Sequence, residues 1–208
     1  MARAGSSRIR DAGLAPRGRA LHDWAAARMG ALRSAASSLG SRPLAGLTVA
    51  FCLQVTPETS VLVLEAMGLG ARAVACAGNP HTTSDAIAAH LAASGATVHA
   101  WAGQGAREFA ACARRAGPRI VGGTEETTTG VRRMRALFAR HEARYPIIAV
   151  NDARTKATFD NAYGTGQSAV DALMRSCGLL VASRAAVVAG YGPVGRGVAA
   201  RLGGLGAR

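Results

Sequence analysis

The basic residues of this chain are almost all arginine, and the one exception is Lys156. It lies in a polar stretch together with Asp160 and Asn161. An ammonium group is a compact donor that can lose its proton when it is desolvated, whereas a guanidinium group keeps its proton. The single lysine therefore indicates proton handling rather than a simple need for charge. Two ordinary interpretations stand beside this one: a surface lysine left by chance, and an ion pair between Lys156 and Asp160, four residues apart on one helix face.

A second polar stretch reads Glu125-Glu126-Thr127-Thr128-Thr129-Gly130. Three consecutive threonines after paired acids would present hydroxyl groups and backbone donors to a polar ligand such as a ribose. The alternative is a solvated turn with a helix cap.

A glycine-rich segment lies close to Arg208. Gly190, Gly192 and Gly195 have the G-x-G-x-x-G spacing, directly after an apolar run at 186–189 that predicts a strand and at the start of a predicted helix. In that setting the glycines make a tight turn and let the backbone approach a pyrophosphate at the helix N-terminus. The acidic residue that binds the cofactor ribose is expected about 20 residues further on. We therefore expect the first βα unit of a nucleotide-binding domain, cut off at Arg208; a glycine-rich loop without a ligand is the alternative.

Apolar runs alternate with helix-like segments along the rest of the chain. The predicted strands are 47–53, 71–76, 97–101 and 147–150. The predicted helices are 22–39, 57–68, 85–94, 108–115, 131–143 and 167–177. Thr56 is the predicted N-cap of the second helix, with Pro57 at its first position. This alternation predicts parallel βαβ units, which bind ligands at the carboxyl ends of their strands.

Composition excludes several classes of protein. The chain is 49% hydrophobic and 4% aromatic, which suits close helix–sheet packing and not disorder. No apolar run approaches the roughly 18 residues of a membrane-spanning helix. The net charge of +13 comes from scattered arginines without interleaved aromatic residues, which argues against nucleic-acid binding. Residues 1–20 are predicted to be a basic, disordered tail.

The cysteines and histidines carry no metal-binding spacing. The four cysteines are predicted to be buried free thiols in a reducing compartment, and they are Cys52, Cys76, Cys112 and Cys177. We expect no metal site.

Three blocks of the sequence together resemble S-adenosylhomocysteine hydrolases, in the order that the family has. They are 124–131 (Thr-Glu-Glu-Thr-Thr-Thr-Gly-Val), 150–164 with its Asn-Asp and Thr-Lys pairs and its Phe-Asp-Asn triplet, and 187–197 with its glycines. Shorter upstream matches lie at 24–29, 43–46 and 52–56. The resemblance covers the chain from about residue 20 onward.

The resemblance implies a hydrolase that uses NAD as an internal redox catalyst. In that chemistry the ribose 3′-hydroxyl of S-adenosylhomocysteine is oxidised to a ketone, homocysteine is eliminated, water adds, and reduction gives adenosine. It implies that Lys156 and Asp160 contact the 3′-hydroxyl and assist its deprotonation, that Glu126 holds the ribose and that Thr56 contacts the substrate. The residues implied to contact NAD are Thr127, Thr128, Thr129, Asn161, Gly190, Gly192, Pro193, Val194, Gly195, Arg196 and Gly197.

We therefore expect an α/β fold, with a parallel-sheet, Rossmann-like substrate domain followed by the first βα unit of an NAD-binding Rossmann domain. The expected boundaries are 1–20 for the tail, 21–165 for the substrate domain, 166–183 for a connecting helix and 184–208 for the start of the NAD-binding domain. The resemblance also implies a homotetramer with a small-molecule substrate, and we expect a cytoplasmic location without nucleic-acid or membrane partners.

Compared with the family, the sequence given lacks the rest of the cofactor domain and the closing C-terminal segment, and it departs from the family pattern at three further places. Gln54 stands where the family has a histidine, and glutamine can hydrogen-bond but cannot titrate. Thr165 stands where the family has a cysteine. The stretch 101–124 is shorter than in the family and lacks an aspartate-rich segment that holds a candidate base. These departures leave two alternatives open: a catalytically inactive relative that binds a nucleoside, and a module that associates with intact subunits.

Overall fold

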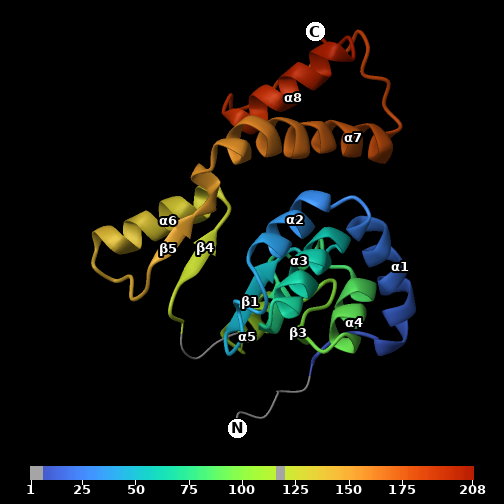
Figure 1. Ribbon diagram of the computed structural model, residues 1–208. Coiled ribbons are helices and arrows are strands. Elements are labelled where there is room, and N and C mark those ends of the chain that lie inside the picture. The colour runs from blue at the N-terminus through green and yellow to red at the C-terminus, as the bar shows by residue number, and fades with distance from the viewer. Residues whose placement is uncertain (1–6, 116–119) are drawn as a thin grey trace. The chain divides into compact units, whose positions relative to one another are not determined.

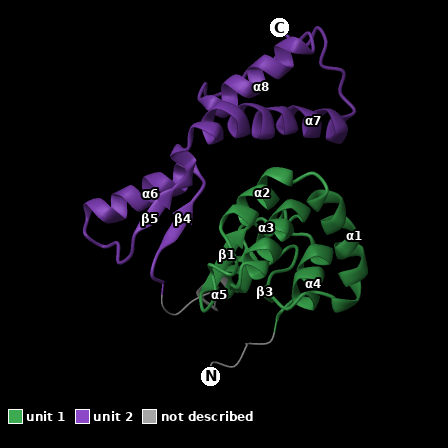
Figure 2. Cartoon of the chain, viewed as in Figure 1, with its two compact units in different colours: residues 1–119 green, residues 120–208 purple. Residues whose placement is uncertain are grey.

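The computed structural model describes residues 7–115 and 120–208, and the chain divides into two compact units (Figure 2). Unit 1 is 1–119 and unit 2 is 120–208. The expected substrate domain, 21–165, does not coincide with either unit. Because the helix that carries Lys156 packs against the helix after the glycine-rich loop, both belong to unit 2.

Unit 1 is a parallel α/β structure, as predicted. Its three-stranded sheet has the order β1-β2-β3, and both strand pairs are parallel. Two helices form the crossovers and another follows the last strand (Figure 1). The bounds of these elements are β1 Thr48–Leu53, α3 Pro57–Gly68, β2 Arg72–Ala77, α4 Asp85–Ala93, β3 Thr97–His99 and α5 Ala106–Arg115.

Small side chains let the layers of unit 1 pack closely. The core holds Ile87, Leu91 and Val98, all fully buried, among many alanines. A Cβ atom built at Gly18 would lie 1.9 Å from the carbonyl oxygen of Ala86, so any side chain at this position would push the helix that carries Gly18, α1 (Ala15–Ala26), off α4. The alanine-rich, aromatic-poor composition thus gives close backbone packing in this unit, as expected.

The expectation of a disordered tail over 1–20 is wrong for residues 7–20, while residues 1–6 lie outside the described part. The backbone of Arg8 forms a parallel bridge along the edge of β3, donating to Val98 O at 2.7 Å and accepting from Ala100 N at 3.2 Å. A 3-10 turn, η1 (Ala12–Leu14), leads into α1 (Ala15–Ala26). The arginine- and glycine-rich composition misled the prediction, because the free edge of β3 and the backbone of α4 offer this segment partners that composition does not reveal.

The predicted single helix over 22–39 is two helices. They are α1, which ends at Ala26, and α2 (Gly30–Ser38). Met29 leaves the helical region, with φ −103° and ψ 46°, and glycine follows it. Apolar spacing continues across this break, so periodicity alone did not reveal it.

A buried histidine predicts how the stability of unit 1 depends on pH. His90 is buried, and among the described residues its Nε2 atom has no hydrogen-bond partner. Burial, followed by the neighbouring His22, lowers the pKa of His90 below its ordinary value of 6.5. The unfolded chain therefore binds a proton at a higher pH than the folded chain does, so the free energy of unfolding should fall as the pH drops through 6.5 toward the folded pKa.

Urea unfolding followed by tryptophan fluorescence tests this expectation, because Trp24 and Trp101 both lie in unit 1. The urea concentration at the unfolding midpoint should decrease as the pH is lowered from about 7.5 to about 5. His90→Gln should flatten that dependence, whereas His81→Gln, at an exposed position, should preserve it. An equal pH dependence in wild type and His90→Gln would contradict the assignment.

Unit 2 begins with a second parallel βαβ unit. β4 (Gly123–Glu125) and β5 (Ile147–Ala149) pair in parallel, and α6 (Thr128–Ala139) connects them. A 3-10 turn, η2 (Val150–Asp152), leads into a π-helix, η3 (Lys156–Thr165), which continues as α7 (Gly166–Cys177). The last helix is α8 (Pro193–Gly204), and it packs on η3 and α7 (Figure 1).

The predicted strand at 186–189 is wrong in the structure. Residues 185–189 form no strand, and Val187 is 95% exposed. A strand needs a hydrogen-bonded neighbour, and none of the five strands of the described residues lies beside this segment. Backbone bonds instead join it to the residues after α8: Ser183 N donates to Gly206 O, Arg208 N to Arg184 O and Ala186 N to Arg208 O, at 2.7–2.8 Å. The chain thus returns alongside this segment after α8, as a βαβ connection would.

The described helices are all too short or too polar to cross a bilayer.

Candidate functional site

Two polar segments of unit 2 follow neighbouring parallel strands at the point where each strand ends. Thr127, Thr128 and Thr129 come after β4, and Asn151 comes after β5. Because carboxyl ends of parallel strands share one edge of a sheet, these segments meet: Thr128 Oγ1 donates to Asn151 Oδ1 at 3.1 Å. The sequence placed Asn151 after a strand, as observed, whereas β4, which precedes the threonines, was not predicted.

Glu125 organises the threonine segment, a role that sequence reasoning missed. Its Oε1 atom accepts from Thr127 N at 2.8 Å and from Thr127 Oγ1 at 2.6 Å. Thr127 Oγ1 in turn accepts from Gly130 N at 2.9 Å and so caps α6. A Cβ atom at Gly130 would lie 2.2–2.7 Å from the Glu125 carboxylate, so glycine leaves room for this carboxylate under the helix N-terminus. The spacing Glu-x-Thr-x-x-Gly could have signalled this arrangement.

We expect Glu125→Ala to lower the free energy of unfolding of unit 2 by about 1 kcal/mol, because it removes two hydrogen bonds and a favourable charge at a helix N-terminus. Glu126→Ala is the matched control for stability, since Glu126 is exposed and its replacement should change stability by less than about 0.5 kcal/mol. Far-UV circular dichroism in urea measures both. Equal effects of the two substitutions would show that Glu125 does not hold the segment.

Lys156, Asp160 and Asn161 form a polar cluster on η3, called the lysine cluster below. The π-helical geometry explains why two residues reach Lys156. Its Nζ atom donates to Asp160 Oδ2 at 2.6 Å and to Asn161 Oδ1 at 3.0 Å. In a helix with i→i+5 hydrogen bonds the residues four and five positions on both flank residue i. The side chain of Lys156 is 20% exposed and that of Asp160 is 54% exposed, while Asn161 is buried. The predicted pair on one helix face is confirmed, and such turns of π-helix are frequent at functional sites.

The glycine-rich loop fits a pyrophosphate at the N-terminus of α8. Gly190 has φ +97°, which favours glycine, and a Cβ atom at Gly195 would lie 2.0 Å from the carbonyl oxygen of Gly190. At Gly192 no described atom would lie within 4 Å of a Cβ, so that side of the loop is open. Gly192 caps α8 without a side-chain hydrogen bond and Pro193 takes the first position, which leaves first-turn N–H groups for an anion. Val194 and Arg196 continue that turn.

The lysine cluster and the glycine-rich loop are joined by one close helix contact. A Cβ atom at Gly197 would lie 2.5 Å from the carbonyl oxygen of Ala162, the residue after Asn161. A Cβ atom at Gly166 would lie 2.8 Å from the backbone of Gly197. The absence of side chains at these two glycines therefore seats α8 directly on the backbone of η3 and α7.

Thr56 belongs to unit 1, whereas the other predicted site residues belong to unit 2. It is the N-cap of α3 in a reciprocal capping box with Thr59, as predicted, with Pro57 at the first helical position. Gln54, just after β1, accepts a hydrogen bond through its backbone oxygen from Thr59 Oγ1 at 2.5 Å, and its side chain is exposed. Of the remaining candidates in unit 2, Glu126 and Thr129 are exposed.

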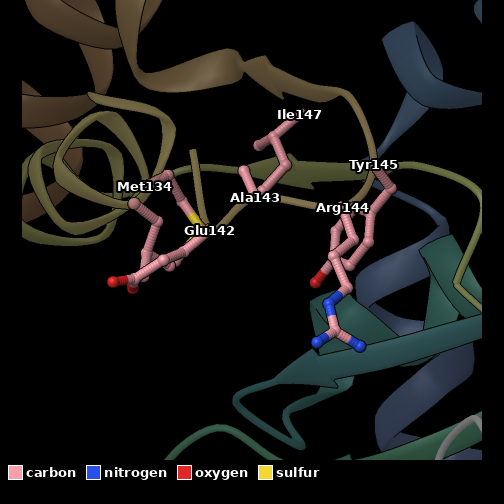
Figure 3. A pocket seen from close by; sticks show the side chains of 7 residues that line it. Met134, Glu142, Ala143, Arg144, Tyr145 and Ile147 are labelled. Atoms are coloured by element: carbon pink, nitrogen blue, oxygen red, sulfur yellow. The ribbon is translucent and has the colours of Figure 1, made fainter. Parts of the chain in front are cut away.

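A pocket of about 150 Å³ in unit 2 does not coincide with the predicted site (Figure 3). Figure 3 shows Met134 and Glu142 on one side of it and Arg144 and Tyr145 on the other. The pocket lies at the amino end of β5, beside Ile147, whereas the candidate residues follow the carboxyl ends of the strands.

Two parallel α/β units and a glycine-rich loop opening a helix define an α/β protein with Rossmann-like, nucleotide-binding elements. Residues 6–119 match the family described as S-adenosyl-L-homocysteine hydrolase, and residues 161–208 match the one described as S-adenosyl-L-homocysteine hydrolase, NAD binding domain. The chain belongs to the S-adenosyl-L-homocysteine hydrolase family. The family resemblance, the α/β fold and NAD as the cofactor are thereby confirmed.

Curated relatives with two different names are similar to this chain. An adenosylhomocysteinase of Aeropyrum pernix is 43% identical over 228 aligned positions, which cover 97% of this chain and 55% of the relative. An S-inosyl-L-homocysteine hydrolase of Methanopyrus kandleri is 41% identical, covering 98% and 54%. An adenosylhomocysteinase of Sulfolobus acidocaldarius is 40% identical, covering 97% and 54%.

The chain spans about half the length of the curated relatives that it matches. The alignment to the Aeropyrum pernix protein, at 228 positions, is longer than the 208 residues of the chain, so that relative has residues without a counterpart here. The two family matches also leave residues 120–160 between them.

Proposed function

We propose that the protein to which this chain belongs hydrolyses the thioether of an S-nucleosyl-L-homocysteine, releasing L-homocysteine and a nucleoside, with NAD as a bound redox catalyst. Bound NAD would supply the reversible oxidation of the ribose 3′-hydroxyl, which makes the neighbouring carbon acidic. The observation that carries the proposal is the contact of Gly197 with Ala162. It seats the helix of the cofactor loop on the helix that holds Lys156, Asp160 and Asn161.

In this proposal Lys156 and Asp160 share a proton at the ribose 3′-hydroxyl. Their side-chain atoms already lie 2.6 Å apart, so a hydroxyl placed against them would exchange a proton over a short path. Asn161 accepts from the lysine, which orients the ammonium group. Glu126 would hold the other ribose hydroxyl, and Thr56 is proposed as a further substrate contact.

The cofactor contacts are proposed at two places. The loop of Gly190, Gly192, Pro193, Val194, Gly195, Arg196 and Gly197 would bind the pyrophosphate at the N-terminus of α8. The hydroxyls of Thr127, Thr128 and Thr129, together with Asn161, would contact the rest of NAD. The open side of Gly192 and the exposed threonine segment support these assignments.

The relatives differ in the nucleobase of the substrate that their names give, so the base is the least determined part of the proposal. Relatives named for S-adenosyl-L-homocysteine and for S-inosyl-L-homocysteine match this chain at 43% and 41% identity. We propose S-adenosyl-L-homocysteine as the substrate, and the inosyl compound is the control that tests the base.

A thiol-release assay tests the function. The protein is loaded with NAD, and homocysteine is measured with a thiol reagent after addition of each thioether. Release from the adenosyl compound with NAD present supports the proposal. Faster release from the inosyl compound would mean that the inosyl compound is the substrate. Absence of release with NAD demonstrably bound would overturn it. Adenosine binding by calorimetry without turnover would then favour a catalytically inactive relative, and co-purification with an intact homologue would favour an associating module.

We also propose a homotetramer in the cytoplasm. Light scattering after size-exclusion chromatography measures the assembly, and a monodisperse monomer of the active protein would contradict it.

A further inference from the structure

Two cysteines lie directly opposite each other on neighbouring strands of unit 1. Cys52 on β1 and Cys76 on β2 are register partners, so their side chains project from the same face of the sheet. Neighbouring strands run about 4.7–4.9 Å apart, which falls within the Cα separation that a disulfide spans. The two Sγ atoms are 2.9 Å apart. No backbone movement is therefore needed to join them.

The two thiols differ in their surroundings. Cys76 is buried, next to α5, which packs against β2 and carries the buried Cys112. Cys52 is exposed, because β1 is the edge strand of this sheet and its outward positions are open. The prediction that all four cysteines are buried is therefore wrong for Cys52 and for Cys177. Small reagents can therefore reach Cys52, whereas Cys76 is shielded from them.

The shared proton makes the exposed thiol the reactive one. The hydrogen bond from Cys76 lowers the pKa of Cys52 to about 7, against the opposing effect of burial. The same hydrogen bond, followed by burial, raises the pKa of Cys76 above its ordinary range. Cys52 is thus the thiolate at neutral pH and Cys76 the thiol that donates to it, a division typical of an attacking and a resolving cysteine.

We propose that Cys52 and Cys76 are a peroxide-sensitive dithiol that closes into a disulfide between β1 and β2. The Cys52 thiolate attacks one oxygen of a hydroperoxide, the O–O bond breaks, and Cys52 becomes a sulfenic acid while the second oxygen leaves as hydroxide or alkoxide, which takes from the solvent the proton that Cys52 had released and becomes water or an alcohol. The sulfur of Cys76 then attacks the Cys52 sulfur, the S–S bond forms, the S–O bond breaks, and the hydroxide leaves with the proton of Cys76 as water. Two thiols have lost two electrons and two protons, and one peroxide has been reduced.

The first step prepares the second. The largest cause of the raised pKa of Cys76 is its hydrogen bond to the Cys52 sulfur, and that thiolate is consumed when Cys52 becomes a neutral sulfenic acid. The closing step then needs only a rotation of the side chains, since register already holds the sulfurs together. A thiol reductant reverses the reaction by attacking the disulfide.

Peptide mapping tests the disulfide on the chain as it stands. The reduced protein is treated with hydrogen peroxide, remaining thiols are alkylated with iodoacetamide, and the protein is cut with trypsin. Cleavage after Arg72 separates the two cysteines, so a disulfide joins two otherwise separate peptides and lowers their combined mass by two hydrogen atoms. We expect this linked pair to form with peroxide and to disappear with dithiothreitol.

Variants assign the two roles. Cys76→Ser should leave a Cys52 sulfenic acid that dimedone traps, and Cys52→Ser should form no linked pair. Cys177→Ser, which removes the other exposed thiol, should leave the linked pair unchanged. A linked pair that contains Cys112 or Cys177, or oxidation of Cys52 to sulfinic acid without any link, would overturn the proposal.

A rate measurement on the wild-type protein guards against variants that do not fold. A thiol with a pKa of about 7 has about fifteenfold more thiolate at pH 7 than one near 8.5, and its lower nucleophilicity reduces the advantage to about threefold. Cys52 should therefore react with iodoacetamide about threefold faster at that pH than a free thiol of pKa near 8.5, such as that of a short unstructured cysteine peptide. The rate of Cys52 should level off above pH 7, where that of the free thiol still rises. Equal rates and parallel pH profiles would sink the proposal.

Discussion

Replacing Lys156 by arginine should lower kcat for thioether hydrolysis by about 10²- to 10⁴-fold, the usual contribution of a positioned acid–base group. The substitution keeps the positive charge beside Asp160 but removes a group that can release a proton, because a guanidinium stays protonated in proteins. The planar guanidinium is also too wide for the two short contacts, 2.6 Å and 3.0 Å, that the ammonium makes to Asp160 and Asn161. NAD should remain bound, since the cofactor loop lies on α8.

The matched control reverses the exchange two residues away. Arg154 is exposed, and Arg154→Lys should leave kcat within about twofold of wild type, as expected of a surface substitution. Homocysteine release, NAD content and the urea midpoint are measured for both variants. If Lys156→Arg retains full activity, the lysine acts only through its charge, and its proposed role at the 3′-hydroxyl fails.

Two glycine-to-alanine substitutions in α8 should change stability in opposite directions. At Gly197 a new Cβ would lie 2.5 Å from the carbonyl oxygen of Ala162, so α8 must move off η3, at a cost of about 1–3 kcal/mol. At Gly203, in the same helix, no described atom lies within 4 Å of the new Cβ, and the better helix propensity of alanine should add up to about 1 kcal/mol. The two variants differ only in position, so the comparison isolates the close contact.

Far-UV circular dichroism in urea, together with tyrosine fluorescence, measures this effect, because all three tyrosines lie in unit 2. Gly197→Ala should also weaken NAD binding by about tenfold for every 1.4 kcal/mol that the shift of α8 takes from the loop. Gly203→Ala should leave NAD affinity unchanged. Equal stability of the two variants would mean that α8 does not rest on η3 as described.

Local sequence signals predicted most of the regular elements of both units, although they missed β4 in unit 2. Thr56 and Pro57 correctly marked the start of α3, and the apolar runs correctly marked β1, β2 and β5. Such signals work because capping and strand patterning depend on residues close together in the chain. The pairing of Lys156 with Asp160 was predictable for the same reason, since it needs only helical spacing.

The errors arose where a segment depends on distant partners. Residues 7–20 were expected to be disordered, yet Arg8 lies along β3 and Gly18 lies against Ala86. Residues 186–189 were expected to be a strand, yet no described strand pairs with them. Whether a segment of ordinary composition is ordered depends on whether another part of the chain can form hydrogen bonds with the backbone of that segment.

By itself the sequence determined the family, the cofactor and the identity of the candidate residues, because these reside in residue types and in spacings of a few positions. Only the tertiary structure decided that α8 rests on η3 through Gly197, that Glu125 lies beneath α6, and that Cys52 faces Cys76. Each of these is a contact between residues brought together by packing or strand register, and composition does not encode which surfaces meet. The lone lysine illustrates both parts: its chemistry could be inferred from its type, and its partner Asn161 came within reach only through the π-helical turn.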